Sequence, residues 1–133
     1  MKIGYAVAPL AAWIAAGGLK FLVNSIRARR PAFDLIGYGG FPSNHAAIAS
    51  SVAWLIGFRE GIAHPAFGVA VAFLFIVCLD AGGLRRHVGR QARAINRLSG
   101  ENSVRERMGH APHELGAGIL VGGLVARLFL PLT

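Results

Sequence analysis

The sequence predicts an all-α fold, an integral membrane bundle of about four transmembrane helices plus one basic amphipathic helix. Hydrophobic residues make up 54% of the 133 residues and charged residues only 15%, far from the averages for soluble domains. Four apolar stretches, none interrupted by an acidic residue, alternate with polar or basic segments. So short a chain has too little polar surface to cover four apolar helices in water. We therefore expect a single membrane-embedded domain over residues 1–133.

The apolar stretches are the expected transmembrane helices, and they cover residues 3–22, 46–58, 65–79 and 115–130. A helix needs about 20 residues to cross a hydrocarbon core about 30 Å thick. The two middle stretches have only about 14 residues, so we expect short spans there. This shortness leaves open whether a second copy of the chain completes the bundle as a homo-oligomer.

Turn-forming and capping residues predict where these helices begin and end. The glycine-rich loop at residues 37–42 favours turns over helix. Ser43 or Asn44 is well suited to cap the second helix, and Pro65 suits the first turn of the third. The run Asp80-Ala81-Gly82-Gly83 is expected to end the third helix.

Residues 84–98 are expected to form the basic amphipathic helix. Apolar residues recur there every three or four positions, with arginines between them: Leu84, Val88, Ala92, Ile95 and Leu98. This pattern is typical of an interfacial helix that lies on lipid headgroups. A polar loop at residues 99–109 then leads to the last apolar stretch.

The formal net charge of +8 is concentrated beside the apolar stretches, with four cations in residues 20–30 and seven arginines in residues 85–107. Alternation of the spans puts the loops at residues 23–45 and 80–114 on one side of the membrane. Their excess of Lys and Arg predicts a cytoplasmic location for these loops, in a membrane of the bacterial inner-membrane type. The charge suits lipid headgroups or phosphorylated substrates, so we expect membrane lipids as partners and no nucleic acid.

Lys20 is the lone cation within an apolar stretch, and Arg27 follows two helical turns later on nearly the same face. Both side chains can therefore converge on one anion. The alternative is that Lys20 merely extends from the end of a span to the headgroups.

The run Pro42-Ser43-Asn44-His45 places a hydroxyl, an amide and an imidazole at a helix start. Free backbone N–H groups and the helix dipole favour a phosphate at such a position, and His45 can also donate a proton. The alternative is simple capping by Ser43 or Asn44, with His45 as an incidental polar residue.

His110 and Glu114 are four residues apart around a proline, so the carboxylate can hold one imidazole nitrogen and turn the other toward a substrate. His113 is a rival for the same role, and Glu114 can instead cap the helix. A zinc site is a minor alternative because this order of residues lacks the spacing of the helical zinc motif. We expect no metal and no other cofactor.

Arg85 and Arg86 can bind phosphate oxygens through their forked guanidinium groups. The alternative is that Asp80 pairs with one of them.

Together these segments resemble the superfamily of type 2 phosphatidic acid phosphatases and vanadium haloperoxidases, whose motifs read K-x6-R-P, P-S-G-H and S-R-x5-H-x3-D. A particular likeness is to the small, divergent membrane branch of that superfamily. The matching segments read PSNH, DAGGLRRHVGRQA and GHAPHE here, and the resemblance covers roughly residues 17–120.

The resemblance implies that His110 attacks phosphorus to form a phosphohistidine, that Glu114 orients it, and that His45 protonates the leaving oxygen. It also implies that Lys20, Arg27 and the backbone around Ser43 neutralise the phosphoryl oxygens. The implied activity is hydrolysis of a lipid phosphate monoester or diphosphate. A cytoplasmic site favours a phosphatidylglycerophosphate-like substrate over a polyprenyl diphosphate.

The sequence departs from the pattern at several positions. The arginine-proline pair stands three residues late, at Arg30-Pro31, so Arg27 keeps the spacing without the proline, and Glu114 replaces aspartate. Asn44 replaces the usual glycine, and Val104 stands where the superfamily has an arginine. Arg105, Arg85 or Arg86 would then have to supply the missing positive charge. The competing hypothesis is a non-catalytic membrane module that binds anionic lipid headgroups.

Overall fold

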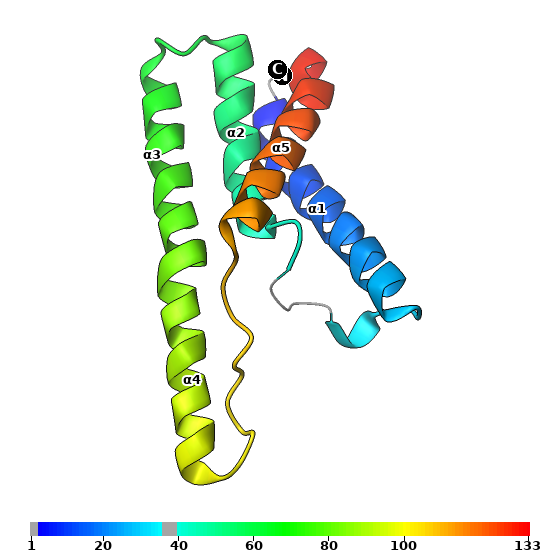
Figure 1. The fold of residues 1–133 in the computed structure, drawn as a ribbon. Coiled ribbons are helices and arrows are strands. Elements are labelled where there is room, and N and C mark those ends of the chain that lie inside the picture. Colours follow the sequence, from blue (N-terminus) through cyan, green and yellow to red (C-terminus); the bar gives the residue numbers. More distant parts are fainter. Residues whose placement is uncertain (1–2, 36–39) are drawn as a thin grey trace.

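The computed structural model describes residues 3–35 and 40–133, whose regular structure consists of helices. The helices are α1 (Gly4–Ala28), α2 (Asn44–Arg59), α3 (Pro65–Leu79), α4 (Arg85–Ser99) and α5 (Pro112–Phe129), with α3 and α4 joined end to end (Figure 1). Short 3-10 turns lie at Phe33–Leu35 and Leu130–Leu132. The all-α prediction is confirmed. Gly37 and Gly39 of the predicted turn-rich loop lie outside the described residues.

Three helical segments are long and apolar enough to cross a membrane: Gly4–Ala28, Pro65–Ser99 and Pro112–Leu132. The fourth helix, α2, has 16 residues, fewer than the roughly 20 that a span needs. It nevertheless lies at the centre of the bundle, where it packs against α1, α3 and α5. Three of the four predicted spans are therefore confirmed as candidates, and a crossing by α2 stays a prediction.

Small residues bring α2 and α5 into close contact. The glycines at positions 118 and 122 are buried, and a side chain at Gly122 would overlap the Ser50 hydroxyl. Ser50 Oγ and Trp54 Nε1 both donate to the Ile119 carbonyl, at 3.4 and 3.2 Å. In lipid the hydrophobic effect does not drive helices together, so close packing and interhelical hydrogen bonds must do so. The α2–α5 interface uses both.

The inward face of α1 is a row of residues spaced four apart: Gly4, Ala8, Ala12, Ala16 and Lys20. Side chains on other faces of the same helix are apolar and exposed, such as Leu10 and Ile14. Because Lys20 continues the packed row, its side chain lies within the bundle and is only 9% exposed. The alternative in which Lys20 extends to the headgroups does not fit this burial.

The α-helix α3 ends at Leu79, directly before the run that was predicted to end it, but the chain does not leave the helical path there. A π-helix at Asp80–Leu84 connects α3 to α4, so the chain forms one helix of 35 residues from Pro65 to Ser99. The segment from Pro65 to Leu84 has about 20 residues, of which Asp80 is the one charged residue, and this length is enough to cross a bilayer. The third span is therefore not short. The basic helix α4 extends the axis of α3 beyond the bundle instead of lying across its end (Figure 1).

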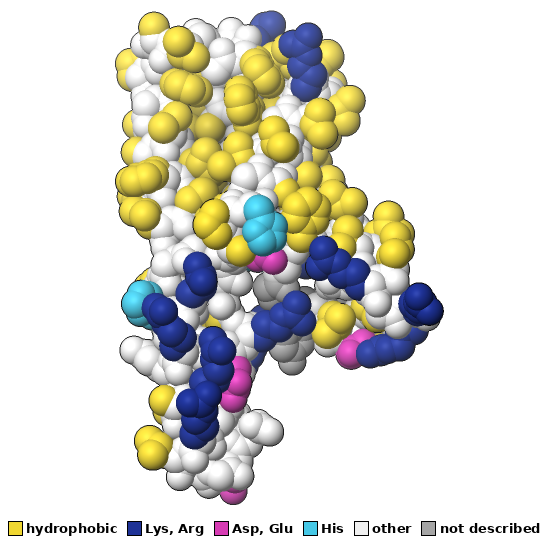
Figure 2. Space-filling model, viewed as in Figure 1, with side chains coloured by type: hydrophobic (Ala, Val, Ile, Leu, Met, Phe, Trp, Pro, Cys, Tyr) yellow, Lys and Arg dark blue, Asp and Glu magenta, His cyan; other side chains and the backbone are white. Residues whose placement is uncertain are grey.

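Hydrophobic side chains gather over the part of the surface formed by the bundle, whereas Lys and Arg gather over α4 and the adjacent end of α1 (Figure 2). The loop that follows α1 and the loop that follows α4 both lie at this basic end (Figure 1). The α2–α3 turn and the C-terminus lie at the other end. The described parts of the two loops thus lie at the same end of the bundle, and their location on one side of a membrane stays a prediction.

Candidate functional site

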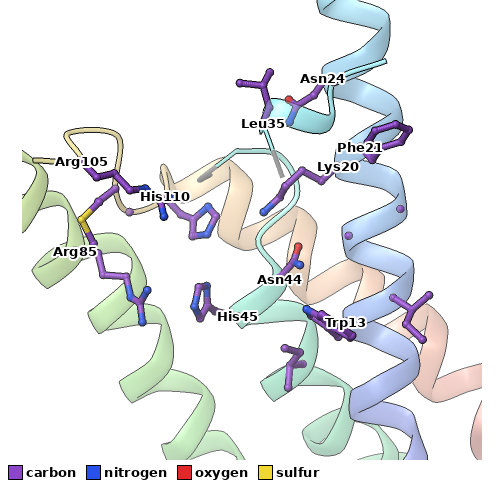
Figure 3. A pocket seen from close by; sticks show the side chains of 17 residues that line it. Trp13, Lys20, Phe21, Asn24, Leu35, Asn44, His45, Arg85, Arg105 and His110 are labelled. Carbon is purple, nitrogen blue, oxygen red and sulfur yellow. The ribbon is translucent and has the colours of Figure 1, made fainter. Parts of the chain in front are cut away.

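A cavity of about 560 Å³ lies at the basic end of the bundle. Its walls come from α1, the start of α2, the start of α4 and the loop before α5 (Figure 3). Its volume is in the usual range for small-molecule sites. The polar side chains that line it are Lys20, Asn24, Asn44, His45, Arg85, Arg105 and His110.

His110 and Glu114 form the predicted pair. His110 is buried, and its Nδ1 lies 3.1 Å from Glu114 Oε2. The same carboxylate oxygen accepts a hydrogen bond from the Ala111 backbone N–H at 3.0 Å, as a helix cap does. Glu114 thus caps α5 and also contacts the histidine, so the two predicted alternatives hold together. A neutral His110 that donates from Nδ1 keeps the lone pair on Nε2 for another partner.

Backbone hydrogen bonds connect this pair to the two other segments of the resemblance. The His110 N–H donates to the Ala81 carbonyl at 2.8 Å, and the Ser43 N–H donates to the Glu114 carbonyl at 2.9 Å. In an α-helix the Ala81 carbonyl would accept from the N–H of Arg85. In the π-helix that N–H bonds to Asp80, one residue earlier, so the Ala81 carbonyl can accept from His110 instead.

The rings of His45 and His110 meet edge to face, with centroids 5.7 Å apart and an interplanar angle of 63°. His45 lies at the start of α2 and His110 in the loop before α5, but both imidazoles line one cavity (Figure 3). Asn44 Oδ1 and His45 Nδ1 are buried without a hydrogen-bond partner among the described residues. Buried polar atoms normally have partners, so these two atoms of cavity-lining residues are unusual.

Arg85 reaches the cavity from the start of α4, and its Nε donates to Asp80 Oδ2 at 2.7 Å. Residues five apart on an α-helix point about 140° away from each other, so the π-helix helps this pair to meet. Arg105 approaches from the loop and also lines the cavity (Figure 3). Of the three arginines that could replace the one missing at Val104, the structure brings two to the cavity.

Arg86 does not line the cavity. It is exposed and packs against Gly109, where φ is +84° and a side chain would come within 2.6 Å of Arg86 Cγ. His113, the rival of His110, is also exposed and outside the cavity lining. The structure therefore places Arg85 and His110 at the cavity and leaves Arg86 and His113 outside it.

The structure does not bring Arg27 to the cavity either. Its rotational position matches that of Lys20, but seven residues advance a helix by about 10 Å, and Arg27 is exposed beyond the cavity. Asn24, one turn after Lys20, lines the cavity instead. The sequence analysis missed Asn24, although its spacing of four from Lys20 was a usable signal.

Ser43 is fully buried and does not line the cavity. Its hydroxyl accepts from the Ala46 N–H at 3.3 Å, and its own N–H is engaged by Glu114. The prediction that Ser43 contacts phosphate directly does not fit these bonds, whereas the capping alternative does. Asn44 and His45 are the members of this run that line the cavity.

Asn96 is a second residue that the sequence analysis missed. It is buried on α4, and its side chain bonds to the N–H and the carbonyl of Val104 at 3.0 and 2.8 Å. Its Nδ2 also donates to Glu106 Oε1 at 2.9 Å. These bonds hold the loop that carries Arg105 and His110 against α4. Its only signal in the sequence was an amide on a helix otherwise rich in arginine.

Burial lowers the pKa of His110, because an imidazolium loses hydration inside the protein. The hydrogen bond and charge of Glu114 oppose this shift, while Lys20 and Arg85 add to it. The histidine therefore stays neutral to a lower pH than a free imidazole. Among the described residues, no group of three His, Cys, Asp or Glu is placed to hold a metal ion.

A family model described as "Divergent PAP2 family" matches residues 3–125 of the chain. The chain is also 30% identical, over 137 aligned residues, to a protein of Bacillus subtilis (strain 168) named "Uncharacterized membrane protein YuiD". That alignment covers 87% of this chain and 87% of the relative. No solved structure matches the chain.

Proposed function

The chain belongs to the divergent PAP2 family, and from this premise we propose that it is a membrane phosphohydrolase that removes phosphate from a lipid phosphate monoester or diphosphate. The observation that carries the proposal is the pair of imidazoles on one cavity, with His110 held by Glu114. Three cations, Lys20, Arg85 and Arg105, line the same cavity and suit a phosphate dianion.

In the first step, Nε2 of neutral His110 attacks phosphorus. An N–P bond forms as the bond from phosphorus to the lipid oxygen breaks. Protonated His45 gives its proton to the departing oxygen, so the lipid leaves as an alcohol or as a monophosphate. Glu114 stabilises the positive charge that develops on His110.

In the second step, water attacks the phosphohistidine. His45, now neutral, takes the proton from this water, and the N–P bond breaks to release inorganic phosphate and restore His110. Lys20, Arg85 and Arg105 stabilise the charge on the phosphoryl oxygens in both transition states. This scheme requires no metal ion.

The substrate follows from the side of the membrane that the site faces. We assign the basic end of the bundle to the cytoplasm because the excess of Lys and Arg lies there. A lipid phosphate produced on that face, of the phosphatidylglycerophosphate type, is then preferred over a polyprenyl diphosphate presented on the other face.

The test is release of inorganic phosphate by the purified protein in detergent from a panel of lipid phosphates, with and without a chelator. We expect release that persists with chelator and is abolished by His110→Ala. His113→Ala is the matched control, because His113 lies three residues away and outside the cavity lining. Brief incubation with ³²P-labelled substrate should trap an acid-labile phosphoenzyme in the wild type but not in His110→Ala. Equal release from the wild type and His110→Ala would refute the proposal.

A non-catalytic headgroup-binding module is the second candidate, and the exposed arginines of α4 favour it. Arg86, Arg90, Arg93 and Arg97 are all exposed on the part of α4 that extends beyond the bundle. Such a cluster attracts anionic lipids. This candidate predicts no phosphate release from any lipid, together with retention of anionic lipid that is lost when these arginines are replaced by glutamine.

A further inference from the structure

A second, apolar groove of about 310 Å³ lies on the membrane-facing side of the bundle. It is formed by three helices, and its lining residues are Pro9 of α1, Ile48, Ala49 and Val52 of α2, and Ala70 and Phe73 of α3. None of these side chains is polar. Ile48 lines both this groove and the cavity that contains the two histidines, so its side chain lies at the boundary between the two spaces.

Two rows of residues lead from the cavity to the groove. On α1, Gly17 and Trp13 line the cavity and Pro9 lines the groove, at intervals of four residues. On α2, His45 lines the cavity and Val52 lines the groove. Seven residues of helix correspond to about 10 Å. The histidines therefore mark the polar end of the two rows, and Val52 marks the apolar end, about 10 Å from His45 along α2.

The groove is bordered by two helices that leave space between them. Both α1 and α3 pack against α2, but among the described residues they share no substantial interface with each other. Phe73, which lines the groove, is 58% exposed, and a side chain at Gly18, which lines the adjacent cavity, would meet no atom within 4 Å. In a bilayer this side of the bundle faces lipid. An acyl chain can therefore enter from the side.

We propose that the groove between α1, α2 and α3 holds a hydrocarbon chain of the lipid phosphate whose headgroup occupies the adjoining cavity, and that this lipid enters sideways from the bilayer. The proposal rests on the proposed function and identifies its substrate as a membrane-resident lipid. The junction at Ile48 is the reason for this occupant, because one molecule with a polar head and an apolar chain matches both spaces.

The groove orients the substrate more than it adds affinity. A chain that moves from the bilayer into the groove leaves one apolar environment for another, so the hydrophobic effect contributes little. Fixing the chain beside Ile48 instead limits how the phosphate can lie against His110. Because positioning affects rate strongly, a blocked groove should lower turnover of long-chain substrates even when the headgroup site is intact.

The first experiment compares Val52→Phe, which fills the groove, with Val71→Phe, which places the same side chain on an exposed position outside its lining. Each is assayed with a long-chain lipid phosphate and with a water-soluble short-chain ester of the same headgroup. We expect Val52→Phe to lower kcat/KM at least about 10-fold for the long-chain substrate only. Val71→Phe should change neither rate. An equal effect of Val52→Phe on both substrates, or on neither, would overturn the proposal.

A second variant guards against misfolding of the first. Phe73→Ala shortens a side chain that lines the groove and therefore widens it. Because Phe73 is exposed, the substitution should not prevent folding. We expect this variant to accept chains with a bulky branch that the wild type turns over slowly, with no change for the short-chain ester. An unchanged preference in Phe73→Ala counts against the groove as a chain site.

A third measurement does not depend on turnover. A lipid phosphate with a photoreactive group in its chain is cross-linked to full-length His110→Ala protein, and the labelled peptides are identified. Labelling within residues 48–52 and 70–73 supports the proposal, even if no variant releases phosphate and the proposed function fails. Phosphate release without labelling of these segments overturns the groove but leaves the proposed function intact. Cross-links between two copies of the chain would identify a second copy as the occupant and refute the proposal.

Discussion

His110 lies between two supports that are built by different means. On one side, α5 packs against α2 through glycine, alanine and serine, so closely that Gly122 has no room for a side chain. On the other side, the loop of residues 100–110 is held against α4 mainly by hydrogen bonds, three of them to Asn96. The first support depends chiefly on missing side chains, with two hydrogen bonds to the Ile119 carbonyl, whereas the second depends chiefly on hydrogen bonds of one buried amide. Substitutions should therefore damage them in different ways.

The largest effect is expected where the first support has no space. In Gly122→Leu the new side chain would collide with Ser50 and with the backbone of Ala47 and Ser51. We expect the unfolding free energy to fall by about 3 kcal/mol or more, with little folded protein recovered. Gly116→Leu is the control, because a side chain there meets no atom within 4 Å. The yield of monodisperse protein on size-exclusion chromatography is the measurement, and equal yields would contradict the packing argument.

Helix α4, which belongs to the second support, also places the positive charge of Arg85 at the cavity. Arg85→Lys tests the role of this side chain. Lysine lacks the forked geometry that lets Arg85 bond to Asp80 through Nε and still present its terminal nitrogens. We expect kcat/KM for a lipid phosphate to fall about 10²-fold without loss of stability. The neighbouring Arg86→Lys should change kcat/KM little because Arg86 lies outside the cavity. A larger effect at Arg86 would show that the wrong arginine has been assigned.

A smaller effect is expected when the loop is loosened but the cavity keeps its side chains. Asn96→Ala removes three hydrogen bonds and leaves buried polar groups of the loop without a partner. The unfolding free energy should fall by about 1–3 kcal/mol. The exposed Asn102→Ala should leave stability unchanged. Thermal unfolding in detergent measures both, and a stability for Asn96→Ala equal to that of the wild type would show that the loop does not depend on this anchor.

The smallest expected change is in the pH dependence of kcat/KM, which reports on His110 between the two supports. Burial lowers the pKa of His110, so the neutral nucleophile persists as the pH falls and is lost only below the value of about 6.5 of a free imidazole. The acid limb of kcat/KM should therefore lie below about pH 6.5. Glu114→Gln removes a charge that opposes this shift and should move the limb to still lower pH, at a reduced rate. A limb that moves upward in Glu114→Gln would contradict the assignment.

Much of the fold was predictable because its signals are local. The apolar stretches, the cap at Ser43 and the proline at the start of α3 each depend on a few adjacent residues, and the structure agrees with all three. The π-helical continuation of α3 into α4 was missed for the opposite reason. Two glycines at positions 82 and 83 disfavour helix locally, but in the π-helix there the Ala81 carbonyl accepts a long-range hydrogen bond from the His110 N–H. That bond does not appear in any local pattern.

The candidate site divides in the same way. The sequence by itself determined which residue types were present and which helix face each one occupied, so spacing and the family resemblance together named Lys20, His45, His110 and Glu114 as candidates. Only the tertiary structure decided how far along each helix the cavity extends, and therefore that Asn24 lines it while Arg27 does not. The physical reason is that helical periodicity encodes rotation about an axis. The level at which two helices meet depends on packing and hydrogen bonds between distant segments.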